Sequence, residues 1–141
     1  MSSARPVSWL SWYLWLVGVV ALLAFAAALM PASWIVSITD RLHLQPFPPN
    51  PVAFYLARHL SLLYGFVGVA LVFLSFRVDR YRELVGHLAI GVIVFGVLQG
   101  VIDLQSGMPM SWTAGESAST VFGGFLLFWL DRVCQSPTDS R

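Results

Sequence analysis

The fold is decided by residues 52–76, which read VAFYLARHLSLLYGFVGVALVFLSF and carry one formal charge, on Arg58. A transmembrane helix needs about 20 predominantly apolar residues to cross the hydrocarbon core of a bilayer. Apolar side chains occupy every side of a helix drawn from this stretch, a pattern that predicts a membrane span rather than an amphipathic surface helix. Three other stretches meet the same requirement, and the sequence therefore predicts four spans, at about residues 8–30, 52–76, 83–102 and 117–133.

The composition of the chain points to the same class of protein. Of its 141 residues, 57% are hydrophobic and 11% are charged, whereas a soluble domain carries about 25% charged residues. A soluble domain of ~150 residues still exposes about a third of its unfolded surface, which a chain this apolar cannot cover with polar groups. The net charge of +1 offers no basic patch for nucleic acid. We therefore expect an all-α integral membrane four-helix bundle that forms a single transmembrane domain over residues 1–141.

The first apolar stretch has two readings. Ala24, Ala26 and Ala28 resemble the small-residue site at which a secretory signal peptide is cleaved. The apolar core is longer than the ~7–15 residues of such a peptide, and it opens with tryptophans that suit a membrane interface. We therefore expect the first span to be retained.

Arginine positions predict the orientation of the spans, because loops on the cytoplasmic side of a membrane carry an excess of basic residues. Six arginines fall in the N-terminal segment, the second connection and the C-terminal segment, which share one side of a four-span protein: Arg5, Arg77, Arg80, Arg82, Arg132 and Arg141. Both termini are therefore expected in the cytoplasm, and the first and third connections are expected outside.

The first connection contains a further predicted element. Four of its apolar residues recur at helical spacing: Trp34, Ile35, Ile38 and Leu42. This spacing predicts a short amphipathic helix that lies in the outer membrane–water interface. Asn50 and Pro51 read as an N-cap followed by proline at the first helical position, so the second span is expected to begin there.

Small residues mark the faces on which membrane helices pack, because close backbone approach favours their association. On the third span Gly96 and Gly100 form a small-xxx-small element, and Asp103 falls on the same stripe. The stripe suits an internal contact as well as it suits a homo-oligomer or a partner membrane subunit. The other partner that the sequence implies is the lipid bilayer itself.

Three charged residues fall toward the outer ends of the packed faces. Arg58 lies about two turns inside the second span, roughly 10 Å from its start at ~1.5 Å per residue, and an unpaired charge at that depth is costly. Asp103 and Glu116 are its expected partners, because a guanidinium fork matches a carboxylate. His59, next to Arg58, is expected to bond Tyr55 one turn earlier, and Trp112 is expected to complete this outer cluster.

The outer cluster has two interpretations. As a structural clamp, it fixes the register of the helices by pairing charges at one end of the bundle. As the lining of a pocket, it binds the head group of a lipid or a quinone, or it holds a proton-transfer pair. The sequence leaves both interpretations open.

Several chemistries lack the residues that they require. A b-type haem needs two histidines at one depth, whereas His59 and His87 fall toward opposite ends of their spans. A di-iron site needs Glu-x-x-His pairs on two helices, and no nucleotide-binding glycine motif occurs. The single Cys134 excludes an internal disulfide and a C-x-x-C redox pair. No catalytic residue, metal ligand or cofactor is predicted, and whether the protein is an enzyme stays open.

Two segments of the chain carry a resemblance. The first is Leu56-Ala57-Arg58-His59-Leu60-Ser61-Leu62-Leu63-Tyr64, followed by Gly65 and an apolar run. The second is Gly100-Val101-Ile102-Asp103, with Gly107-Met108-Pro109 and Trp112-Thr113 ahead of Glu116. Together they resemble small bacterial four-helix membrane proteins similar to the DoxX and BphX-like groups. The resemblance implies a four-helix bundle in a bacterial inner membrane, and it adds weight to Arg58, Asp103 and Glu116.

Two functions follow as expectations. The first is a non-enzymatic membrane module, either an accessory subunit or a binder of a small ligand such as a lipid or quinone head group. The alternative is a membrane subunit of a quinone-linked oxidoreductase, as some DoxX relatives are, and a quinone is the one cofactor that this alternative requires.

Overall fold

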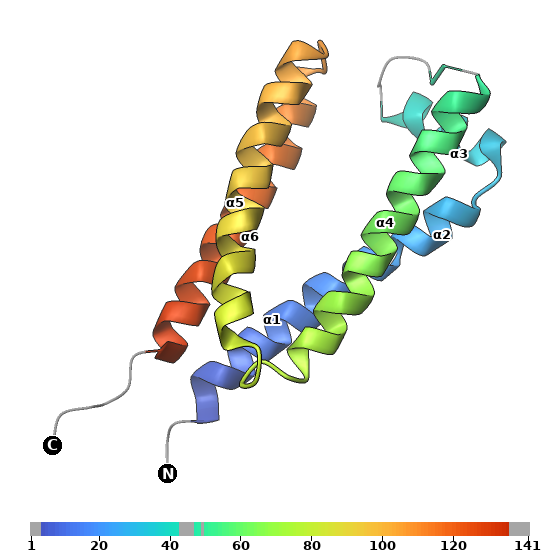
Figure 1. The fold of residues 1–141 in the computed structure, drawn as a ribbon. Coiled ribbons are helices and arrows are strands. Elements are labelled where there is room, and N and C mark those ends of the chain that lie inside the picture. The colour runs from blue at the N-terminus through green and yellow to red at the C-terminus, as the bar shows by residue number, and fades with distance from the viewer. Residues whose placement is uncertain (1–3, 43–46, 49, 136–141) are drawn as a thin grey trace, which may run out of the picture. The chain divides into compact units, whose positions relative to one another are not determined.

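The computed structural model describes residues 4–42, 47–48 and 50–135, and within them every regular element is a helix (Figure 1). The helical segments are α1 (Ala4–Leu22), α2 (Ala24–Leu29), α3 (Ala32–Arg41), α4 (Pro51–Ser75), α5 (Arg82–Gln105) and α6 (Met110–Gln135). The all-α prediction is therefore confirmed. The C-terminal Arg141, which entered the orientation argument, lies outside the described residues.

Three stretches are long and apolar enough to cross a membrane: Trp9–Ala28, Pro51–Ser75 and Arg82–Gln105. Only 11% to 17% of the residues in these stretches are buried inside the protein, so most of their apolar side chains need another apolar environment. Three membrane-capable helices indicate a membrane protein. Helix α6 contains the stretch predicted as the fourth span but is not among the three, and it carries Glu116, Asp131 and Arg132.

The first predicted span is divided at Leu23 into α1 and α2. Leu23 keeps right-handed helical torsions, with φ −60° and ψ −20°, and its N–H donates to Val20 O at 3.1 Å. The break is therefore one tightened turn rather than a change of direction. Helix α2 ends ahead of Pro31, where Met30 has the extended ψ of 140° that a residue before proline favours.

The first connection contains the helix that was predicted for it, α3. Its hydroxyl side chains bond to their own helix, since Ser37 Oγ donates to Ser33 O at 2.8 Å. Its apolar Trp34 and Ile38 are exposed. The predicted cap of the next helix is also confirmed, because the Ala53 N–H donates to Asn50 Oδ1 at 2.8 Å.

The chain divides into two compact units. The α4 unit comprises residues 14–74, and the hairpin unit comprises residues 1–13 and 75–141. Helix α1 contributes to both.

In the α4 unit, helices α1 and α4 approach each other closely at glycines. A methyl group on Gly68 would lie 2.7 Å from Leu22 N and 2.8 Å from Gly18 O, which are backbone atoms that cannot move aside. A methyl group on Gly65 would lie 2.6 Å from the ring of Phe25. That ring also packs edge-on against Phe66, with centroids 5.3 Å apart. The absence of side chains at these glycines is therefore what allows the close approach.

In the hairpin unit, α5 and α6 lie side by side along their length (Figure 1). Gly107, with φ +69°, forms the turn between them, a conformation that glycine adopts without strain. A methyl group on Gly96 would lie 2.8 Å from Val121 Cγ2 and 3.0 Å from Val121 N. One on Gly124 would lie 2.9 Å from Ile93 N. The glycine stripe predicted on the third span thus packs inside the hairpin.

We expect Gly96→Ala to lower the stability of the protein by about 1–2 kcal/mol, because the clash with Val121 outweighs the better helix propensity of alanine. Gly91→Ala is the matched control on the same helix, since no heavy atom lies within 4 Å of a methyl group there. Thermal unfolding of both variants in one mild detergent measures the difference. An equal or higher midpoint for Gly96→Ala would contradict this account of the hairpin contact.

Candidate functional site

The predicted outer cluster is divided between the two units. Tyr55, Arg58 and His59 belong to the α4 unit, whereas Asp103, Trp112 and Glu116 belong to the hairpin unit. Each group of three lies on neighbouring turns of its own unit. The pairing of Arg58 with the two carboxylates stays a prediction.

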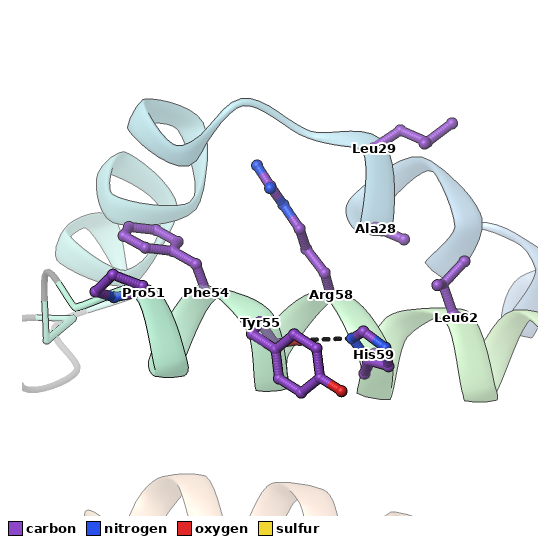
Figure 2. A pocket seen from close by; sticks show the side chains of 8 residues that line it. All are labelled: Ala28, Leu29, Pro51, Phe54, Tyr55, Arg58, His59 and Leu62. Carbon is purple, nitrogen blue, oxygen red and sulfur yellow. Dashed lines mark hydrogen bonds between the residues drawn. The ribbon is translucent and has the colours of Figure 1, made fainter.

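A pocket of about 500 Å³ lies along the N-terminal half of α4. Its walls are formed by Ala28, Leu29, Pro51, Phe54, Tyr55, Arg58, His59 and Leu62 (Figure 2). Figure 2 shows the Arg58 side chain extending from α4 toward the segment that joins α2 to α3. Its Nη2 donates to Met30 O at 3.3 Å. Because a guanidinium has five N–H donors in a planar fork, most of them stay available to a ligand.

His59 and Tyr55 form the polar, aromatic wall of this pocket. Their ring centroids lie 3.9 Å apart, and His59 Nδ1 lies 3.0 Å from the Tyr55 carbonyl oxygen. A carbonyl only accepts hydrogen bonds, so Nδ1 is the donor in this contact. The pairing expected between these two residues is therefore present. The pocket offers a cationic donor at Arg58 and an imidazole ring at His59.

Few negative charges accompany Arg58 in its own unit. Residues 14–74 contain one carboxylate, Asp40, which lies on α3. The exposed Arg58 guanidinium has no ion-pair partner among the described residues of this unit. A positive charge in an apolar, aromatic pocket recognises an anionic or strongly hydrogen-bond-accepting group.

In the hairpin unit, the other half of the predicted cluster lies near the turn between α5 and α6. Asp103 is in the last turns of α5, and its Oδ2 atom is buried without a hydrogen-bond partner. The Glu116 carbonyl accepts hydrogen bonds from the hydroxyls of Ser119 and Thr120, both at 2.9 Å. These hydroxyls therefore reinforce α6 itself.

The opposite end of the hairpin holds an ion pair that the sequence reading missed. Arg82 Nε lies 4.0 Å from Asp131 Oδ1, and the Asp131 side chain is 2% exposed. A methyl group on Gly86, one turn after Arg82, would lie 3.3 Å from Asp131 Oδ2. Glycine at position 86 therefore leaves room for the carboxylate against α5.

A signal for this pair exists in the sequence. Arg82 is at the N-terminal end of its helix and Asp131 is near the C-terminal end of the next one, so each charge is unfavourable for its own helix dipole. In an antiparallel hairpin, however, the start of α5 meets the end of α6. Each charge is then placed favourably for the dipole of the neighbouring helix.

Cys134 lies one turn beyond Asp131 and beyond the predicted fourth span. Burial raises the pKa of the Cys134 thiol, and the nearby Arg82 guanidinium opposes part of that shift. The thiol is therefore protonated at neutral pH, which is unsuitable for a nucleophile. Within the described parts of the chain, no three His, Cys, Asp or Glu side chains gather in a way that holds a metal ion.

Comparison of the chain with protein-family models, with curated proteins and with solved structures yields no match.

We expect Asp131→Ala to lower stability by about 2–3 kcal/mol, because it leaves the Arg82 guanidinium partly buried without its carboxylate. Asp79→Ala is the matched control, since Asp79 is an exposed carboxylate in the turn just before α5, the helix that carries Arg82. Replacing both charges, with Arg82→Leu and Asp131→Leu, should recover most of the loss. Thermal unfolding in detergent measures all three, and equal midpoints for Asp131→Ala and Asp79→Ala would refute the structural role of the pair.

Proposed function

We propose that this chain is a non-enzymatic membrane module that binds the head group of a lipid or a quinone in the pocket around Arg58. The observation that carries the proposal is this pocket of about 500 Å³, which combines the Arg58 guanidinium with aromatic and apolar walls. A lipid or quinone has the same two parts, a polar head and an apolar tail. The mostly exposed apolar surface of α4 gives the tail a path beside the pocket.

The proposed architecture is a four-span bundle in a bacterial inner membrane with both termini in the cytoplasm. The three membrane-capable helices support a membrane location, and the arginine distribution supports the orientation. Helix α6 would be the fourth span. At its inner end, pairing with Arg82 lowers the cost of placing Asp131 near a membrane. The resemblance of residues 56–64 and 100–116 to DoxX and BphX-like proteins agrees with this architecture.

The depth of Arg58 supports a head-group site. Arg58 is about two turns from the start of α4, which is roughly 10 Å along a helix that rises ~1.5 Å per residue. With the first connection outside, this position lies just below the outer interface. Phosphates and quinone carbonyls lie near that level of a bilayer, and arginine binds both as a hydrogen-bond donor.

The alternative function is a membrane subunit of a quinone-linked oxidoreductase. The observation that favours it is the lining of the pocket, which combines the Arg58 guanidinium with the His59 imidazole. A quinone carbonyl accepts a hydrogen bond, and a quinol hydroxyl donates one. A copurifying phospholipid fits only the binding module, whereas a copurifying quinone fits both functions.

Arg58→Gln should reduce the amount of copurifying lipid or quinone about fivefold or more, because glutamine keeps a polar amide but is shorter than arginine and carries no charge. The measurement is mass spectrometry of small molecules extracted from protein purified in mild detergent. Arg41→Gln is the control, since Arg41 is exposed on α3 of the same unit and does not line this pocket.

Loss of either molecule in Arg58→Gln but not in Arg41→Gln supports the proposed site. A phospholipid at this site supports the binding module over the oxidoreductase subunit, whereas a quinone fits both functions. A wild-type protein that carries neither, or an Arg58→Gln variant that retains the full amount, would overturn the proposed site.

The orientation is testable with single cysteines in a Cys134→Ser background. Gln105→Cys, at the end of α5, should react with a membrane-impermeant maleimide on intact cells. Ser140→Cys should react only after the membrane is permeabilised. The reverse pattern would invert the proposed topology, and labelling of both positions on intact cells would contradict a membrane crossing by α6 between them.

A further inference from the structure

Three buried oxygen atoms near the turn of the hairpin unit have no hydrogen-bond partner. They are Asp103 Oδ2 on α5, and Thr113 Oγ1 and Ser117 Oγ on α6. Thr113 is 6% exposed, so it is more than nine-tenths buried. A buried polar atom without a partner costs about 1–3 kcal/mol, and most buried polar atoms in proteins are satisfied. Three such oxygen atoms at one end of one helix pair therefore indicate a bound group that satisfies all three.

The packing of the hairpin places the residues of these atoms on turns of α5 and α6 that lie next to each other. A methyl group on Gly100 would lie 3.1 Å from Ser117 Oγ, so these two positions face each other. Asp103 is one turn after Gly100 on the same stripe of α5, and Thr113 is one turn before Ser117 on α6. Since the helices run antiparallel, both turns lie on the side of the connecting Gly107. The carboxylate and the two hydroxyls therefore occupy one seam between the helices.

The donor set is made of oxygen alone. Hard cations prefer carboxylate, hydroxyl and carbonyl oxygens, whereas zinc and copper favour imidazole and thiolate. The seam contributes one carboxylate, and one negative charge neutralises one monovalent cation. A divalent ion would leave a net positive charge in a poorly hydrated place, which is costly. The last-turn carbonyls of α5 and water can complete the coordination shell.

We propose that Asp103, Thr113 and Ser117 bind an alkali-metal cation between α5 and α6. The cation satisfies the three buried oxygens together and ties the end of α5 to the start of α6. This site lies within the hairpin unit and does not depend on the lipid or quinone pocket of α4. Its role is to fix the outer end of the hairpin, opposite the Arg82–Asp131 pair.

The test is the thermal midpoint of the full chain in a neutral detergent at constant ionic strength. Choline chloride is replaced stepwise by NaCl, and separately by KCl, up to 100 mM. A ligand that binds only the folded state stabilises it by mass action, and we expect a rise of about 4 °C in at least one of the two salts. Titration of the protein into ²³Na⁺ solution, followed by the sodium NMR linewidth, gives a second readout of binding.

Variants assign the effect to the seam. Thr113→Val and Ser117→Ala keep the side-chain volume nearly constant and remove one hydroxyl each, and both should lose most of the salt-dependent rise. Ser119→Ala is the matched control, because Ser119 is exposed and its hydroxyl bonds only within α6. Asp103→Asn should abolish the rise. If that variant does not fold, the two hydroxyl variants decide the question.

Two results would overturn the site. One is a midpoint that is the same in choline, sodium and potassium chloride. The other is an unchanged alkali-cation effect in Ser117→Ala and Thr113→Val. An effect that is lost in these two variants and kept in Ser119→Ala supports the proposal, whichever of the two cations produces it.

Discussion

Close backbone contact at glycines is the interaction on which both units of this protein depend. Apolar side chains that face lipid gain nothing by meeting one another, so the hydrophobic effect does little to hold membrane helices together. Dispersion contacts and hydrogen bonds must hold them instead, and both require the backbones to come near. Gly68 against Leu22, and Gly96 against Val121, provide that approach in the α4 unit and the hairpin unit respectively. These contacts also hold the polar groups of the hairpin at fixed positions along its length.

Polar side chains in this chain are concentrated at helix ends, and they have different partners there. Hydroxyls such as Ser37 and Thr120 bond to their own helix and cost little in an apolar environment. Charges cannot be satisfied in that way. Asp131 meets Arg82, while Arg58 faces a pocket and Asp103 lies in a seam. These differences in partner, rather than differences in residue type, separate a structural ion pair from a candidate ligand site.

The helices and their ends follow from local features, and for this reason the sequence predicts them well. Long apolar runs predict α4 and α5, Pro31 ends α2, and Asn50 caps α4, because each effect acts within one or two turns. The division at Leu23 has no such local signal, since no proline or glycine is near it. Helix α6 begins at Met110, well before the apolar stretch predicted from residue 117, because its first turns are helical but too polar to belong to an apolar stretch.

The candidate site is only partly predictable, because its contacts join distant parts of the chain. The pairing of His59 with Tyr55 is within one turn and was expected. Arg82 was used only to predict the orientation of the spans in the membrane, so its pairing with Asp131 on α6 was not predicted.

The Arg82–Asp131 pair also constrains how this sequence can change. Losing one charge leaves the other partly buried and unpaired, whereas losing both, or exchanging them, keeps the hairpin end neutral. A lineage that substitutes only one of the two residues passes through a less stable protein, so substitutions at positions 82 and 131 should occur together. In a family of such chains, covariation between them would report the antiparallel register of the hairpin from sequences alone.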